Sequence, residues 1–144
     1  MREQTGRASI GDFNTLVASV SSEEQFNQEV SERFVGPSGF MIFAEFDHGQ
    51  WISHYGIDRQ VLRIILGNPL IAITMLRDDI SVGLFAPVEL LLVDHENGSG
   101  CTLYYVRPSS LMMIEKNAQL AAAALELDRK LELLISNITG FSGQ

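Results

Sequence analysis

Residues 40–46 read FMIFAEF, and this stretch decides the fold because it is the strongest strand signal in the chain. Residues 61–66 (VLRIIL) and 88–93 (VELLLV) repeat its run of large apolar side chains. Successive side chains of a strand point to opposite faces of a sheet, so the three segments together define two faces. One predicted face is purely apolar and should lie under helices: Phe40, Ile42, Ala44, Phe46, Leu62, Ile64, Leu66, Val88, Leu90 and Leu92.

The second predicted face carries one ionisable group per strand among large apolar side chains: Met41, Phe43, Glu45, Val61, Arg63, Ile65, Glu89, Leu91 and Val93. This face is too apolar to remain in water. At about 25 cal/mol per Å² of apolar area, covering a few hundred Å² of it contributes on the order of 10 kcal/mol before the costs of association. The sequence therefore predicts a covering segment of the chain, or a homodimer, over this side of the sheet.

Two further segments have strand character. Residues 15–20 alternate between apolar and polar side chains, which predicts a short strand. Residues 102–106 should pair with 88–93, because the loop between them contains Asn97-Gly98, a pair that favours a hairpin. Together with the helices described next, these strands predict an α+β two-layer sandwich with a mainly antiparallel sheet of about five strands and helices packed on one face.

Helices are predicted between the strands and after them. Ser22 followed by Gln25 is a helix-capping pattern, and the helix that begins there should end before Gly36. The clearest helix spans residues 120–138, where apolar residues fall within an arc of roughly 100°. The other predicted helices are short: one from Asp47 through Trp51 and Tyr55 to Gly56, and one at 71–76.

Length and charge limit the possible functions. The chain has 144 residues and a net charge of -8; one domain is predicted at 14–138, with a flexible tail at 1–13 and another at 139–144. Ten lysines and arginines are scattered rather than clustered, which argues against a nucleic-acid partner. No stretch approaches the roughly 20 apolar residues of a membrane span, and the first dozen residues lack the apolar core of a signal peptide. We therefore expect no membrane association and a cytoplasmic location.

The one cysteine, Cys101, cannot form an internal disulfide and is predicted to be a small buried residue on a strand. Three histidines, His48, His54 and His95, lack the four-residue spacing of a helical metal pair. No metal and no cofactor is predicted.

The ionisable groups of the second face, Glu45, Arg63 and Glu89, could meet there, since a guanidinium offers donors to two carboxylates. Such a set is either a structural ion-pair cluster or a ligand-binding site. The strand register decides whether the three side chains reach one another.

Asp47-His48 is the most suggestive catalytic pair, because it ends a predicted strand and histidine titrates near neutral pH. Asp47 could equally cap the short helix that follows. Gly67-Asn68-Pro69 separates a strand from a helix, and it could present amide groups to an anion or simply form a turn.

Several of these residues are similar to a known family. They are Phe43 to His48, Gly56, Ile65 to Pro69 with its Gly-Asn-Pro step, Pro87 followed by Val88 to Val93, Tyr105, Pro108 and the final leucine-rich helix. On these residues the segment from Gly39 to about Leu134 resembles the DUF302 domain, whose structures are TT1751-like with a TBP-like arrangement of sheet and helices. The resemblance implies a β-α-β4-α layout and homodimers, and it implies no activity. The family's Leu-Pro before the fourth strand is Ala86-Pro87 in this chain, and its acidic residue near the end of that strand is Asp94-His95.

Two functions of different classes compete, ahead of a third, a structural role as a subunit of a larger assembly. The first is a dimeric, non-enzymatic module that binds a small ligand or a protein partner in a groove beside the sheet. Its expected ligand-binding residues are Glu45, Arg63, Gly67, Asn68 and Glu89. The second is a small hydrolase or isomerase that uses His48 with Asp47 or Tyr105 near Gly67-Asn68-Pro69. It requires these groups to converge within hydrogen-bonding distance.

Overall fold

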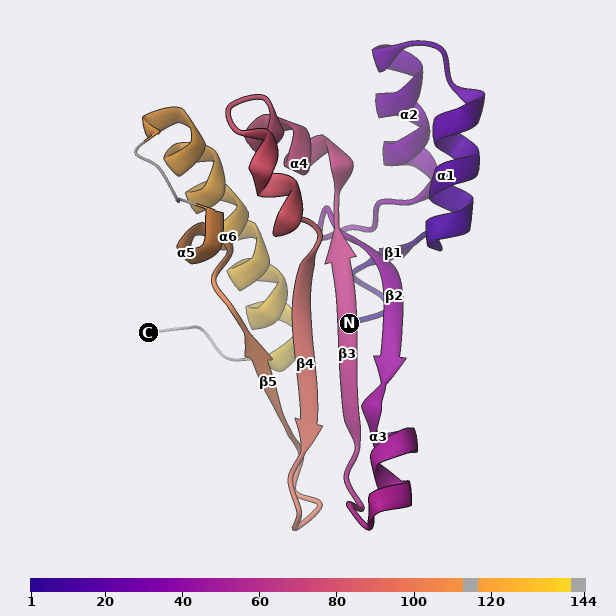
Figure 1. Cartoon of the computed structure of the whole chain (residues 1–144), viewed down its shortest axis with the longest axis vertical. Coiled ribbons are helices and arrows are strands. Elements are labelled where there is room, and N and C mark those ends of the chain that lie inside the picture. The colour runs from indigo at the N-terminus through magenta and orange to yellow at the C-terminus, as the bar shows by residue number, and fades with distance from the viewer. Residues whose placement is uncertain (113–116, 141–144) are drawn as a thin grey trace.

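The computed structural model describes residues 1–112 and 117–140 (Figure 1). A mixed, mostly antiparallel sheet of five strands lies at its centre, with the strands side by side in chain order. They are β1 (Gly6–Arg7), β2 (Met41–Asp47), β3 (Val61–Gly67), β4 (Val88–Asp94) and β5 (Cys101–Tyr105). β1 is parallel to β2, and each later strand is antiparallel to the one before it. The predicted α+β fold class is therefore confirmed.

Helices occupy the connections between the strands and the end of the chain. They are α1 (Ile10–Ser19), α2 (Glu23–Arg33), α3 (His48–Ile52), the 3₁₀ helix η1 (Ser53–Tyr55), α4 (Pro69–Leu76), the 3₁₀ helix η2 (Ile80–Leu84), α5 (Pro108–Met112) and α6 (Ala118–Thr139). The helices expected from capping and periodicity correspond to α2, α3 with η1, α4 and α6. Within the described residues, no helix has both the length and the apolar composition that crossing a bilayer requires.

α6 lies against one face of the sheet, which we call the covered face, and α4 lies beyond the ends of β3 and β4, where it contacts α6 (Figure 1). Asn117 begins α6, because its side chain accepts the N–H groups of Gln119 and Leu120. The apolar stripe of α6 then packs on the strands. Buried residues of this core include Phe40, Ile42, Ile64, Leu66, Val88 and Leu90 from the sheet side and Leu120, Ala124, Leu127, Leu131 and Leu134 from α6.

The strand predicted at 15–20 is wrong, because α1 spans this segment. Ser9 Oγ accepts the N–H of Asp12 at 3.0 Å, and the carboxylate of Asp12 accepts the N–H of Ser9 at 3.1 Å. This reciprocal cap begins a helix ahead of the alternating residues, and Leu16 is then buried in a small core with Val30 of α2. A local cap therefore prevailed over a short alternating pattern.

The fifth strand is β1, which lies in the segment predicted to be a flexible tail at 1–13. The N–H of Gly6 donates to Phe40 O at 2.9 Å, and that of Ala8 donates to Ile42 O at 3.1 Å. A Cβ at position 6 would lie 1.7 Å from the carbonyl oxygen of Phe34, so the close approach requires glycine. Residues 6–7 thus form β1, and residues 10–13 belong to α1. Of the predicted tail at 139–144, residue 139 ends α6, residue 140 caps it, and 141–144 lie outside the described residues.

A β-bulge in β2 changes which side chains share a face. Ile42 lies opposite Leu66, but Ala44 lies opposite Ile65, so the register shifts by one residue between them. Beyond the bulge, Phe46 lies beside Arg63 and Glu45 beside Ile64. The assignment of Ala44 and Phe46 to the covered face is therefore wrong, as is that of Glu45 to the opposite one, because an extra residue inverts the alternation.

The opposite face of the sheet has a partial cover. α1 and α2 stand beside the β2 edge (Figure 1) and pack on Met41 and on Phe43. Met41 is fully buried there, and the rings of Phe13 and Phe43 meet edge to face at 5.7 Å. The covering segment expected over this face is therefore the helical pair α1–α2, and it reaches only one corner of the sheet.

Candidate functional site

The rest of that second face, which we call the open face, carries the following side chains: Ala44, Phe46, Val61, Arg63, Ile65, Glu89, Leu91, Val93, Thr102 and Tyr104. Phe46, Arg63, Leu91 and Tyr104 lie opposite one another in a row across four strands. Phe46 is 49% exposed and Tyr104 55% exposed. An aromatic side chain thus stands at each end of a mainly aliphatic surface.

Arg63 and Glu89 are the charged residues at the centre of the open face. Arg63 Nε donates to Glu89 Oε2 at 3.0 Å, and its Nη2 donates to the second carboxylate oxygen. This bidentate bond raises the pKa of Arg63, and the guanidinium also lies 6.0 Å from the centre of the Phe46 ring. The pair is a structural ion pair whose two charges neutralise each other.

Glu45 does not join this pair, because the bulge turns it away from Arg63. Its carboxylate is 2.5 Å from Arg7 Nη2 and 3.7 Å from Arg2 Nη2. Glu45 therefore fastens the N-terminal segment to β2, and the three predicted groups form two separate ion-pair sets.

The residues proposed for catalysis lie at opposite ends of the sheet. Asp47 pairs with Leu62 and Met41 pairs with Gly67, so five residues of β3, roughly 17 Å at 3.3 Å each, separate the two ends. Tyr105 lies opposite Leu90 on β5, two strands from β3. The structure does not assemble these candidates into one site.

The local contacts of Asp47 and His48 are structural. Asp47 Oδ1 accepts the N–H of Gln50 at 3.2 Å and caps α3. His48 Nδ1 accepts the indole N–H of Trp51 at 3.1 Å. Both of these interactions stabilise the helical turn after β2, in line with the capping alternative for Asp47.

Gly67-Asn68-Pro69 forms a turn whose polar groups are already used. Asn68 Nδ2 donates to Gly39 O at 2.9 Å, and Asn68 Oδ1 accepts the N–H of Leu70 at 2.8 Å. Pro69 has no N–H, and Ile71 donates its own to Asn68 O. The first amides of α4 are therefore unavailable to an anion.

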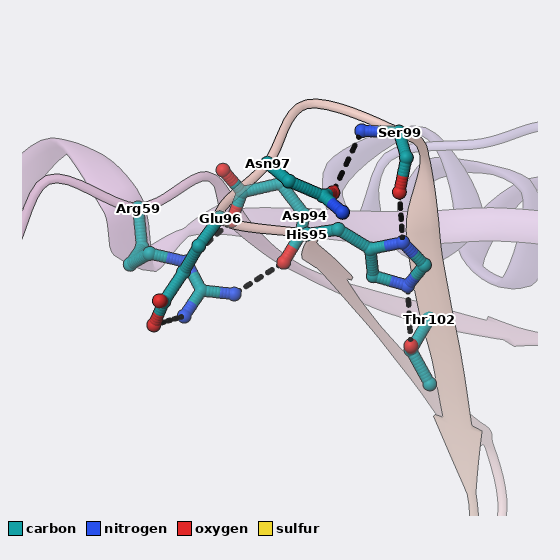
Figure 2. Close-up of polar contacts among 7 residues, drawn as sticks. All are labelled: Arg59, Asp94, His95, Glu96, Asn97, Ser99 and Thr102. Atoms are coloured by element: carbon teal, nitrogen blue, oxygen red, sulfur yellow. Dashed lines mark hydrogen bonds and ion pairs between the residues drawn. The ribbon is translucent and has the colours of Figure 1, made fainter.

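A polar cluster at the β4–β5 hairpin escaped the sequence analysis (Figure 2). Arg59 Nε donates to Asp94 Oδ1 at 2.8 Å, Nη1 to Glu96 Oε1 at 3.1 Å, and Nη2 to the carbonyl of Asp94. The hydrogen bond from Arg59 lowers the pKa of the Asp94 carboxyl below its ordinary range. The guanidinium thus joins the entry of β3 to the end of β4.

In the same cluster, the two nitrogens of the His95 ring each face a hydroxyl (Figure 2). Nδ1 is 3.1 Å from Ser99 Oγ, and Nε2 is 2.9 Å from Thr102 Oγ1. Both ring nitrogens are engaged within the hairpin, so this arrangement fixes the loop. The Asp94-His95 dipeptide was the available signal, but a partner 35 positions earlier in the chain cannot be read from spacing.

A further expectation is corrected at this end of the sheet. Cys101 is exposed on β5, so its predicted burial is wrong; it lies opposite Asp94 at the last pair of the hairpin. Within residues 1–112 and 117–140 no three His, Cys, Asp or Glu side chains come together as a metal ion would require.

The comparisons with known proteins agree with the architecture. The family model DUF302, described as a domain of unknown function, matches residues 16–138. The chain belongs to the DUF302 family. A solved DUF302 structure, an uncharacterised conserved protein from Bacillus stearothermophilus, is similar with a TM-score of 0.56 and 18% identity, over 82% of this chain and 84% of that chain. At this identity the likeness shows the fold alone. No curated protein matches the chain.

Proposed function

We propose that this DUF302 protein is a non-enzymatic interaction module that forms a homodimer through the open face of its sheet. The observation that carries the proposal is the row Phe46, Arg63, Leu91 and Tyr104, which leaves two aromatic rings about half exposed beside a neutralised ion pair. We place the dimer in the cytoplasm, where an exposed lone thiol such as Cys101 stays reduced.

The distribution of charge favours the open face as the surface through which two copies associate. The chain carries a net charge of -8, so most surfaces of two copies repel each other. Among the residues that define the open face, the charged ones are Arg63 and Glu89, which are bonded to each other. The cluster of Arg59, Asp94 and Glu96 adjoins this face only at its margin, beside Thr102 and Tyr104. Two open faces related by a two-fold axis therefore meet without net charge, and each presents the same apolar and aromatic groups to the other.

The area of the open face indicates that residues around its rim also contribute to the dimer interface. Four strands about 4.8 Å apart and about seven residues long form a platform of roughly 440 Å², whereas a stable interface buries about 800 Å² per partner. Further contacts must come from the rim. Trp51 and Tyr55, in the helical turns that follow β2, are 55% and 78% exposed and supply residue types common in interface anchors.

Sedimentation velocity over a range of concentrations tests the proposal. The wild-type chain should sediment as a dimer, and Phe46→Glu or Tyr104→Glu should raise the dissociation constant at least about a hundredfold, because each places an unpaired charge in a desolvated surface. Both side chains are about half exposed, so the variants should keep the far-ultraviolet circular dichroism of the wild type.

A matched control comes from the outer side of α6. Leu133 is 62% exposed and belongs to a second apolar stripe, with Leu125 at 48%. Leu133→Glu should leave the dimer unchanged. A wild-type monomer at high concentration, or a dimer broken by Leu133→Glu and not by Phe46→Glu, would refute the open face as the interface.

A further inference from the structure

An apolar pocket lies where β3 and β4 meet α4, away from the row that carries the proposed dimer. It has a volume of about 130 Å³ and is lined by Phe13, Phe43, Gly67, Asn68, Pro69, Ile71, Ala72, Met75, Ala86, Pro87, Val88 and Leu127. Met75, Val88 and Leu127 are buried and form the floor, while Pro87 is exposed at the mouth. The pocket therefore opens to solvent from inside the main core.

The pocket has no polar side-chain group to offer. Asn68 is its one polar side chain, and that amide is already bonded to Gly39 O and to the N–H of Leu70. A buried water needs two to four polar partners, so the pocket is a poor site for ordered water. A polar ligand group placed there would lose its hydrogen bonds to solvent without replacement.

Gly67 helps to form the hollow. A Cβ at this position would lie 3.1 Å from Pro87 Cβ and 3.5 Å from Phe43 Cε2. The missing side chain lets these two rings approach the end of β3 and leaves space beside them. The glycine of the Gly-Asn-Pro step thus serves a packing role here.

We infer that this pocket binds a small apolar group, of the size of a benzene ring or a short branched alkyl chain. An engineered apolar cavity of about 150 Å³ in another protein stays dry and takes up benzene. The pocket under α4 is of the same order of size and equally apolar. The inference is independent of the dimer, since none of the four residues in the open-face row lines the pocket.

Titration of the methyl-labelled protein with benzene, followed by NMR, tests the inference. Saturable shifts are expected at the methyl groups of Ile71, Met75 and Leu127, which surround the space. Hydroquinone should bind about tenfold more weakly or worse, because its two hydroxyls lie at opposite ends of the ring and one of them must enter the apolar interior without a partner. Absence of saturable shifts, or equal affinity for hydroquinone, would overturn the inference.

Two identical substitutions on α4 supply the matched control. Ile71 lines the pocket, whereas Ile73 is 40% exposed and lines a separate groove beside α2. Ile71→Phe should weaken benzene binding at least about tenfold, since added side-chain carbons and ligand exclude each other. Ile73→Phe should leave it unchanged; equal loss in both variants would contradict the assignment.

If Ile71→Phe does not fold, a variant that enlarges the pocket still tests the inference. Ile71→Ala should increase affinity for naphthalene relative to benzene, and an unchanged preference would count against the site. Intermolecular NOEs in the wild type decide between occupants: contacts from a second copy to Met75 would show that a protein side chain fills the space, and would overturn the small-ligand assignment. Sedimentation in the presence of benzene should show the same oligomer, so the two proposals fail separately.

Discussion

The two faces of the sheet come from the same strands but differ in how far helices of the same chain bury them. On the covered face, Ile64 and Leu90 are almost completely buried under α6. Their strand neighbours Arg63 and Leu91 point to the open face and keep contact with solvent. The covered face is a closed core within one chain, whereas the open face is apolar without being closed. The first face serves folding, and the second is the face through which we propose that the chain associates.

The largest expected effect compares two phenylalanines that simple alternation places together. Phe40 is fully buried in the covered core, and Phe46 is 49% exposed beyond the bulge. Phe40→Ala should lower the free energy of unfolding by about 3–5 kcal/mol. Phe46→Ala should lower it by only about 1 kcal/mol, because about half of its surface stays in water on folding of the monomer.

Urea denaturation of dilute protein, at concentrations below the dimer dissociation constant, measures both values. Similar losses for the two variants would mean that Phe46 is as buried as Phe40, and would remove the distinction between the faces. A larger loss for Phe46→Ala at high protein concentration alone is the expected signature of association through the open face.

Most strands and helices could be predicted from the sequence because their signals are local. Ser22 caps α2, residues 61–66 lie within β3, and the glycine at 56 ends η1 in a left-handed conformation. The bulge after Ile42 could not be predicted, because it depends on the register between two strands rather than on either strand alone. β1 is two residues long and gives no periodic signal.

The candidate site was harder to predict for the same reason. Glu45, Arg63 and Glu89 share a face only if β2 alternates without interruption, and one extra residue in β2 separated Glu45 from the other two. Arg59 and Asp94 were missed because their contact spans 35 positions. The excess of apolar side chains on the second face could be predicted, because that prediction needs only a count of side chains in the strands and not their exact register.

The next largest expected effect concerns a buried polar contact between α5 and α6, on the covered side of the sheet. Asp128 of α6 is 5% exposed and accepts the N–H of Ser109 at 2.9 Å and its hydroxyl at 2.5 Å. Asp128→Asn keeps the shape but removes the charge that strengthens both hydrogen bonds, and its amide NH2 faces the Ser109 hydroxyl, which must turn and accept instead of donate. We expect a loss of about 1–3 kcal/mol in the free energy of unfolding.

Glu132→Gln on the same helix is the control. Glu132 is paired with Arg107 at 2.9 Å in an exposed setting, so its loss should stay below about 1 kcal/mol. Equal losses of unfolding free energy for the two variants, in thermal or urea denaturation, would show that Asp128 does not make a buried contact. The contrast between a closed covered face and an open face would then be weaker.

The smallest effect tests the far end of the covered face, where Asp94 continues the row of Leu90 and Leu92 but is held by Arg59 instead of a helix. The hydrogen bond from Arg59 places the pKa of Asp94 in the folded protein below the ordinary value of 3.8. A lowered folded pKa means that the unfolded chain binds the proton more readily. The stabilisation is therefore present above about pH 4 and is lost as the pH falls through the lowered value.

Arg59→Gln should accordingly reduce stability near neutral pH, and its difference from the wild type should shrink as the pH falls through the lowered pKa of Asp94 and the carboxyl becomes protonated in both states. Unfolding free energies measured by urea between about pH 2 and pH 6 give the comparison. The double variant with Asp94→Asn should show nearly the same pH dependence as Asp94→Asn alone, because the remaining carboxylate partner of Arg59, Glu96, is 84% exposed and contributes little. A constant difference between wild type and Arg59→Gln across the whole range would mean that the guanidinium acts through packing of its stem and not through the charge of Asp94.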